Sequence, residues 1–216
     1  MKAWCDVMAG TPGFKVYLIT DRRLFPEAAL LYRAVEAALR AGIGAVQLRE
    51  KDLPLREMLA MAYRLREITG RHGARLFVND RIDVALAIHA DGVHLGCESV
   101  PAGAARKVVG ERMLIGVSTH SVGEAERAEK EGADFVTLGP VYETASKLRY
   151  GQPLGADVLR QAKTALSVPV FAIGGITKER ITEVREAGAD GVAVISAILA
   201  SDDVKSSAGE FMRLMT

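Results

Sequence analysis

Eight short runs rich in β-branched and other apolar residues alternate with segments of helical periodicity along this chain, and this alternation restricts the fold more than any other feature. The helical period is clearest in residues 26–41, where apolar side chains recur every three or four positions, and it returns in residues 55–72 and 122–131. The predicted strands are residues 16–20, 45–49, 75–78, 92–95, 113–118, 135–138, 168–173 and 191–195. Such alternation is typical of a parallel sheet whose strands are joined by helices.

Eight strands alternating with helices in 216 residues predict an α/β protein, a compact single-domain (β/α)8 TIM barrel. A doubly wound open sheet is the alternative. That fold expects a Gly-x-Gly-x-x-Gly turn after the first strand, where this chain has Thr20-Asp21-Arg22-Arg23 instead. No composition shift or proline-rich stretch marks an interior boundary, so we expect one domain over residues 1–216, with residues 1–14 as an N-terminal extension.

The balance of acidic and basic residues argues against partners that are attracted by a long-range electrostatic field of the protein. Lys and Arg number 28 and Asp and Glu 27, a formal net charge of +1, so we expect no nucleic acid and no membrane as partners. Any anionic ligand must be bound locally. Two distant cysteines, Cys5 and Cys97, and the lack of an apolar run of about 18 residues indicate a cytoplasmic protein, with a homo-oligomer left open.

In a TIM barrel the functional residues gather at the C-terminal ends of the strands, and polar residues follow the predicted strands here. The loop of residues 139–155 is the most prominent of these segments. Its Thr144, Ser146 and Lys147 offer two hydroxyls and an ammonium to a phosphate or pyrophosphate. An ordinary polar surface loop is the alternative interpretation.

The end of the second predicted strand carries two cations and an amide. Gln47, Arg49 and Lys51 are spaced by two, so on a strand their side chains share one face. That face should be the barrel mouth, because Val46 and Leu48 take the helix-facing side. The set suits a phosphorylated polar heterocycle, and an internal ion-pair network with nearby carboxylates is the alternative.

Asp80 is the predicted metal ligand. Together with Asn79 it supplies oxygen ligands of the type that Mg²⁺ prefers, although a salt bridge to a neighbouring Arg or Lys would also explain it. Gly174-Gly175 and Ile195-Ser196 end the last two strands, where barrels often bind phosphate, and tight packing could account for the glycine pair. His120 is either a general base or a hydrogen-bonded structural histidine, and His94 has the same two interpretations.

The ordered set of motifs from about residue 16 to residue 201 closely resembles the thiamine phosphate synthase family, whose superfamily also contains the TenI-type thiazole tautomerases. The motifs are Ile19-Thr20-Asp21-Arg22, Gln47-Leu48-Arg49-Glu50-Lys51, Asn79-Asp80-Arg81, Ala90-Asp91-Gly92-Val93-His94-Leu95-Gly96, Gly116-Val117-Ser118-Thr119-His120, Gly139-Pro140, Ala172-Ile173-Gly174-Gly175-Ile176 and Val194-Ile195-Ser196-Ala197-Ile198. The resemblance implies a transferase that couples hydroxymethylpyrimidine pyrophosphate with thiazole phosphate or its carboxylate in thiamine biosynthesis. Thiamine phosphate and pyrophosphate would be the products, and Mg²⁺ the cofactor.

The resemblance also implies roles for individual residues. Catalysis would fall to Lys51, Ser118, Lys147 and His120. The pyrimidine pyrophosphate site would contain Gln47, Arg49, Lys51 and Asn79, with Asp80 on the metal. Ser118, Thr144, Ser146 and Lys147 would hold the pyrophosphate, and Gly175, Ile195 and Ser196 the thiazole phosphate.

Two departures from the family pattern keep other functions open. Synthases usually read Gln-x-Asp after His-Leu-Gly and place a second metal ligand on that Asp, whereas this chain has Cys97-Glu98-Ser99, which leaves Ser99 or Glu98 as the candidate. Tyr142-Glu143-Thr144 stands where synthases usually have an aromatic residue and Pro-Thr, which looks more like TenI, a tautomerase in which His120 would move a proton. The third interpretation is a non-catalytic protein that binds thiamine precursors.

Overall fold

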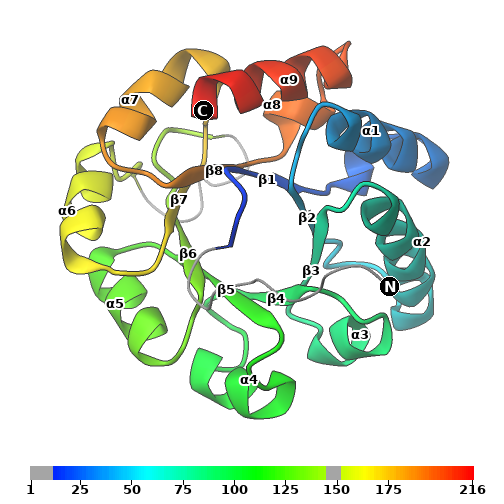
Figure 1. Cartoon of the computed structure of the whole chain (residues 1–216), viewed down its shortest axis with the longest axis horizontal. Helices are drawn as coiled ribbons and strands as arrows, with labels where there is room; N and C mark the ends of the chain where they lie inside the picture. The colour runs from blue at the N-terminus through cyan, green and yellow to red at the C-terminus, as the bar shows by residue number, and fades with distance from the viewer. Residues whose placement is uncertain (1–11, 145–151) are drawn as a thin grey trace.

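The computed structural model describes residues 12–144 and 152–216, and their eight parallel strands form a closed ring with the helices outside it (Figure 1). Each strand pairs with the next, and β8 pairs with β1 through Val16 and Val192. The strands are β1 (Val16–Ile19), β2 (Ala45–Leu48), β3 (Arg75–Asn79), β4 (Gly92–Leu95), β5 (Leu114–Thr119), β6 (Phe135–Leu138), β7 (Val170–Ile173) and β8 (Gly191–Val194). The predicted (β/α)8 barrel is confirmed.

Helices connect successive strands and cover the outside of the barrel (Figure 1). Three of them match the segments predicted from periodicity to within two residues at each end: α1, α2 and α5. The described helices are η1 (Arg22–Leu24), α1 (Ala28–Arg40), α2 (Leu55–Arg71), α3 (Ile82–Ala87), α4 (Ala102–Val109), α5 (Val122–Lys130), α6 (Asp157–Ala165), η3 (Lys178–Arg180), α7 (Ile181–Glu186), α8 (Ser196–Leu199) and α9 (Val204–Met215).

Two separate apolar clusters stabilise the barrel. The larger one lies between strands and helices and includes Val46 and Leu48, so the predicted helix-facing side of β2 is confirmed. The smaller one fills the barrel interior with aromatic rings, among them Tyr17 and Phe135, whose centroids lie 5.6 Å apart. Phe14, the last residue of the predicted N-terminal extension, packs into this interior cluster.

In the barrel interior, a glycine on one strand repeatedly packs against a phenylalanine on the neighbouring strand. Phe77 on β3 lies in register with Gly92 on β4, and a Cβ at Gly92 would come within 2.3 Å of that ring. The same arrangement joins Phe135 to Gly116 and Phe171 to Gly191, with 2.4 Å and 2.3 Å to the ring. A large ring therefore fills the space that its neighbour leaves empty, as close packing requires.

Two Gly-Ala-Asp segments, residues 132–134 and 188–190, have a structural role at the N-terminal ends of the strands. Asp134 Oδ2 accepts hydrogen bonds from the Ile115 backbone N–H and from Arg106 Nη2, both at 2.6 Å. Asp190 accepts likewise from the Val170 N–H at 3.0 Å and from Lys163 Nζ at 2.7 Å. Each aspartate accepts from a backbone N–H near the start of a strand, Ile115 of β5 or Val170 of β7, so the two segments share a structural role rather than a binding site.

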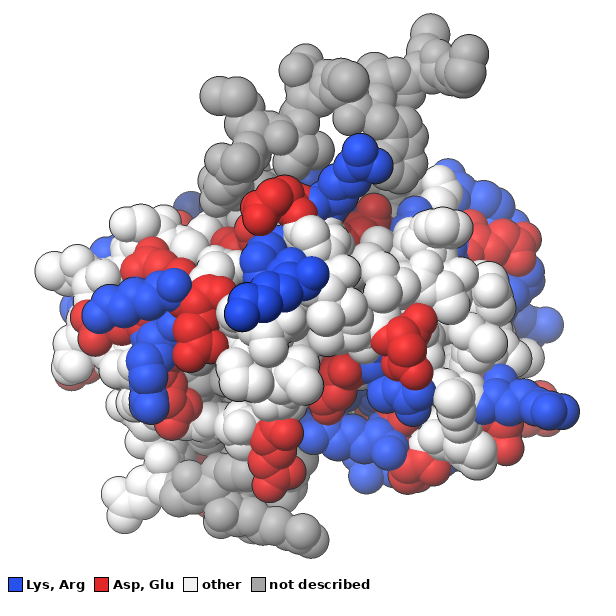
Figure 2. All heavy atoms as spheres, turned by 90° about the horizontal axis from the view of Figure 1, so that it is seen from below, with Lys and Arg blue, Asp and Glu red and all other residues white. Residues whose placement is uncertain are grey.

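The surface carries no single dominant charge on the side that Figure 2 shows, where acidic and basic side chains are interspersed. This mixture agrees with the formal net charge of +1. Within the described residues, no helix has the length and apolar character needed to cross a membrane.

Candidate active site

The end of β2 brings one polar side chain into the barrel interior. Gln47 is 1% exposed, and its Nε2 donates a hydrogen bond to the Tyr17 hydroxyl at 3.1 Å. The strand ends at Leu48, and Lys51 lies three residues further on in an exposed turn. The alternation of a strand therefore places Gln47 at the mouth as predicted, but it does not set the direction of Lys51.

Arg49 and Lys51 make no side-chain ion pair within the parts of the chain that the structure describes. Glu50, the nearest carboxylate in sequence, instead accepts hydrogen bonds from the Arg22 backbone N–H at 3.0 and 3.2 Å. Burial raises the pKa of Glu50, and hydrogen bonds from Thr20 and from the Arg22 N–H oppose that rise. The alternative of an internal ion-pair network around the two cations is therefore not found, and both cations stay available to an anionic ligand.

Asp80 follows β3 at the mouth with a backbone φ of 60°, a left-handed conformation that is uncommon outside glycine. Its carboxylate accepts hydrogen bonds from Asn79 Nδ2 at 2.6 Å and from the Gly96 N–H at 3.2 Å. The alternative of a salt bridge to Arg49, Lys51 or Arg81 is not found among the described residues, and Arg81 pairs with Asp83 instead. Only uncharged donors hold Asp80 among the described residues, so its negative charge is available to a cation.

Ser99 lies beside Asp80, in the position where the family pattern has a second carboxylate. Its hydroxyl donates to Asp80 Oδ1 and accepts from the Gly96 N–H at 2.6 Å. Glu98 is exposed. No cluster of three His, Cys, Asp or Glu side chains able to hold a metal occurs in residues 12–144 and 152–216. A hard cation here would have Asp80 and the oxygens of Asn79 and Ser99, with its remaining ligands coming from a bound phosphate group.

The ends of β4 and β5 meet through His94 and Ser118. Ser118 Oγ lies 3.0 Å from His94 Nε2, and His94 is 2% exposed. Burial is the main cause that lowers the pKa of His94 to about 3, so the ring is neutral at physiological pH. His120 lies in the loop after β5, where its Nδ1 is 3.4 Å from a carboxylate oxygen of Glu124.

The loop after β6 extends against the end of β7. The Val141 N–H donates to Ile173 O at 2.9 Å, and the Tyr142 N–H donates to Gly174 O at 3.0 Å. Gly175 has a φ of 65°, and a Cβ there would lie 2.7 Å from Glu143 O. Packing against this loop is therefore sufficient to require glycine at position 175.

The remaining predicted phosphate ligands are placed only in part. Thr144 is half-buried at the end of the described part of this loop, and Ser146 and Lys147 lie outside the described residues. Ile195 precedes α8, and Ser196 opens that helix with an exposed side chain. The two residues lie at the C-terminal end of β8, as predicted.

Thr137, which the sequence motifs did not indicate, belongs to a polar layer in the barrel interior. Gln47, His94 and Thr137 come from alternate strands, β2, β4 and β6, which together build one layer of a barrel interior. Gln47 Oε1, His94 Nδ1 and Thr137 Oγ1 are buried and have no hydrogen-bond partner within the described part of the protein. Strand alternation could have found Thr137, because it is two residues after the interior Phe135.

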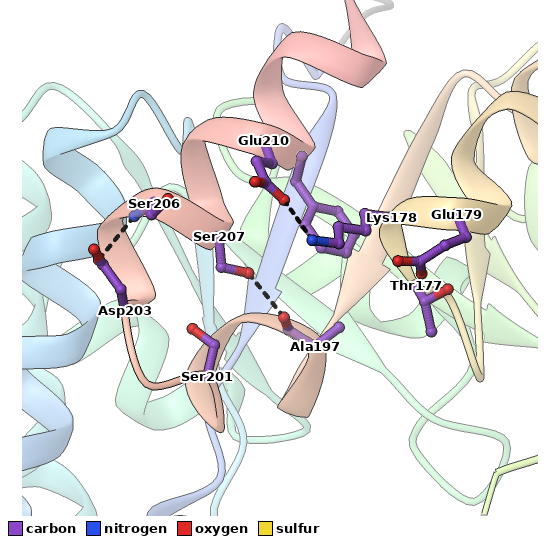
Figure 3. A pocket seen from close by; sticks show the side chains of 10 residues that line it. Thr177, Lys178, Glu179, Ala197, Ser201, Asp203, Ser206, Ser207 and Glu210 are labelled. Carbon is purple, nitrogen blue, oxygen red and sulfur yellow. Dashed lines mark hydrogen bonds and ion pairs between the residues drawn. The ribbon is translucent and has the colours of Figure 1, made fainter.

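A pocket of about 400 Å³ opens outside this mouth, between η3, α8 and α9 (Figure 3). Thr177, Ala197 and Ser201 lie along it, and the Lys178–Glu210 ion pair, 3.1 Å long, crosses it. None of the predicted site residues that the structure describes lines this pocket. The side chains at the strand ends therefore remain the candidate site.

The fold and the site together define a class: a TIM barrel whose C-terminal mouth combines a carboxylate with cations that have no ion pair among the described residues, which suits phosphorylated small molecules. The chain belongs to the thiamine monophosphate synthase family, since the sequence profile of that family matches residues 16–198.

Several relatives match over nearly their whole length. A protein of Geobacter sulfurreducens is 51% identical over 202 residues, which cover 94% of each chain. The thiamine-phosphate synthase of Chloroflexus aurantiacus is 43% identical over 204 residues, covering 94% of this chain and 93% of the relative. Among solved structures, a thiamine phosphate pyrophosphorylase from Pyrococcus furiosus has a TM-score of 0.85 at 41% identity, covering 94% and 95% of the two chains.

Proposed function

We propose that this chain is a thiamine phosphate synthase. It transfers the pyrimidine methylene group of hydroxymethylpyrimidine pyrophosphate to the nitrogen of thiazole phosphate, releasing pyrophosphate, or to that of its carboxylate, releasing pyrophosphate and CO2. Family membership and the coverage of the relatives support this activity. The observation in the site that carries it is the pair of cations, Arg49 and Lys51, which make no ion pair with a carboxylate among the described residues.

The chemistry fits these residues. As the C–O bond breaks, pyrophosphate leaves with the electron pair and the pyrimidine methylene becomes cationic, and the thiazole nitrogen lone pair then forms the new C–N bond. Such a reaction needs stabilisation of the departing negative charge more than it needs a base. Arg49, Lys51 and Lys147 would supply positive charge, and the Ser118 hydroxyl would supply a hydrogen-bond donor.

Mg²⁺ is the proposed cofactor, with Asp80 as its protein carboxylate and Asn79 and Ser99 beside it. The ion would supply positive charge to the pyrophosphate oxygens. A carboxylate held only by uncharged donors within the described residues fits such an ion. The side chains of this chain hold the substrate and keep the carboxylate directed at the mouth.

The direct test is to supply both substrates with Mg²⁺ and to measure thiamine phosphate and pyrophosphate. We expect equal amounts of the two products. Parent protein that yields neither product, although it binds both substrates in calorimetry, would favour the non-catalytic binding protein.

Ser99→Asp restores the carboxylate that the family usually has beside the metal. We expect this variant to tighten the apparent affinity for Mg²⁺ by about tenfold, because a second negative charge close to a divalent ion is worth more than 1 kcal/mol in a partly buried site. Ser99→Asn, which adds the same bulk without charge, is the matched control. The measurement is the Mg²⁺ titration of turnover, and an unchanged midpoint would assign the second ligand to another group.

A TenI-type tautomerase is the second candidate, favoured by the carboxylate of Glu124 near His120, which could orient that ring as a base. The two activities predict opposite effects. In a synthase, Lys51→Ala and Lys147→Ala each lower turnover by about tenfold or more, since a charge-assisted contact is worth about 1.5 to 3 kcal/mol, and His120→Asn is mild. A tautomerase would instead lose about a hundredfold in His120→Asn. Thiazole isomerisation that depends on His120, without coupled product in the parent protein, would overturn the synthase.

We also propose that the enzyme works in the cytoplasm on small phosphorylated substrates. Two cysteines, 92 positions apart in sequence, support a reducing compartment, and the mixed surface charge gives no reason to expect a polyanionic partner.

A further inference from the structure

His94 is a buried polar side chain at the end of β4 to which the proposed reaction gives no role. Its ring lies among aromatic neighbours, with centroids 5.6 Å from Tyr17 and 5.8 Å from Phe135. Within residues 12–144 and 152–216, only its Nε2 has a side-chain hydrogen-bond partner, Ser118 Oγ at 3.0 Å. Ser118 is the hydroxyl assigned above to the leaving group, so whatever fixes the direction of its hydrogen affects the reaction.

The surroundings of His94 Nδ1 determine which ring nitrogen carries the proton. Nδ1 is buried without a hydrogen-bond partner in the described part of the protein. It lies against the open face of Gly116, where a Cβ would be 2.6 Å from Nδ1 and 2.4 Å from the Phe135 ring. Buried N–H groups without a partner are rarer than buried acceptors without one. The neutral ring is therefore more stable with Nδ1 bare and the proton on Nε2.

A proton on Nε2 sets the hydrogen bond to Ser118. The ring donates and Ser118 Oγ accepts, so the serine keeps its own hydrogen for another acceptor. With the opposite tautomer, the Ser118 hydroxyl would donate its hydrogen bond to the unprotonated Nε2. It would then present only lone pairs to a pyrophosphate oxygen. We propose that His94 is a positioning residue, which donates Nε2–H to Ser118 and thereby keeps the serine hydrogen for the departing pyrophosphate.

This inference rests on the proposed function, so its experiment has one readout that needs no substrate. In protein labelled with ¹⁵N-histidine, the two ring nitrogens of His94 give separate NMR signals that distinguish bare nitrogen from N–H. We expect the Nε2–H tautomer in the parent protein, and assignment from the loss of that signal in His94→Phe. Observation of Nδ1–H, or of a doubly protonated ring, would overturn the proposal.

The second readout is a double-mutant cycle of turnover. We expect His94→Phe to lower kcat by about tenfold with little change in KM, because a transition-state donor loses its orientation. In a Ser118→Ala background the same substitution should change kcat by less than about twofold, since no hydroxyl remains to orient. His94→Gln, whose amide N–H can replace Nε2–H, should recover part of the loss, and thermal unfolding of each variant separates this effect from packing.

The results of these experiments distinguish a failure of the positioning role of His94 from a failure of the proposed synthase activity. Full additivity of the two substitutions would mean that His94 acts only as packing, and the positioning role would be wrong. Parent protein that forms no thiamine phosphate would overturn the proposed function, while the tautomer of His94 would still be read from its spectrum.

Discussion

Asp80→Asn should abolish Mg²⁺-dependent turnover, with a loss on the order of a hundredfold or more, because metal stabilisation of transition-state charge is worth several kcal/mol. Asparagine has the same shape and keeps an oxygen that can accept from Ser99 and the Gly96 N–H, while its amide nitrogen replaces the oxygen that accepts from Asn79. The substitution therefore removes the charge and little of the packing. Turnover as a function of Mg²⁺ concentration is the measurement.

Asp83→Asn is the matched control for this charge removal. Asp83 is exposed, pairs with Arg81 and opens α3 three residues further along the chain. We expect its loss to leave kcat and the Mg²⁺ midpoint within about twofold, since exposed ion pairs contribute little. Asp80→Asn with an unchanged Mg²⁺ dependence would remove Asp80 from the metal site.

Gly92→Ala should lower the free energy of unfolding by about 3 kcal/mol, the upper end of the range for overpacking in a close-packed core. The added Cβ would lie 2.3 Å from the Phe77 ring and 2.6 Å from Leu114 O, and backbone cannot move aside as a flexible side chain can. Thermal unfolding should show a decrease of roughly 6–12 °C in Tm.

Gly209→Ala provides the control with the same chemical change. Gly209 lies within α9, and a Cβ there would have no neighbour within 4 Å. Alanine in a helix interior is about 1 kcal/mol more favourable than glycine, so this variant should unfold at a higher temperature. Equal Tm changes in the two variants would contradict the packing account of Gly92.

The architecture could be predicted because it depends on local patterns. Alternation of strands and helices fixed the number of strands and their parallel pairing, and the apolar stripe of residues 26–41 located α1 within two residues. Glycine before a strand also has a local cause, as at Gly132 and Gly188, whose φ values are 91° and 95°. Strand ends differ by one or two residues because they depend on pairing with neighbours, which one segment does not contain.

The direction of a site side chain could be predicted only where the alternation along a single strand determines it. Gln47 reaches the interior as its alternation with Val46 and Leu48 predicts, whereas Lys51 lies beyond the point at which β2 ends. The contact of His94 with Ser118 depends on the register of β4 with β5, which aligns His94 with Gly116. Motif spacing within one segment carries no information on that register.

The glycine and phenylalanine pairs of the interior also constrain the order in which substitutions at these positions could be acquired. A larger residue at position 92 would lie 2.3 Å from the Phe77 ring and 2.6 Å from Leu114 O, so a smaller residue at position 77 must be acquired first and relieves the ring contact alone. The reverse order passes through an overpacked intermediate that folds poorly. The interior volume is thus shared between two positions 15 apart in sequence, and their substitutions are epistatic in a direction that the strand register specifies.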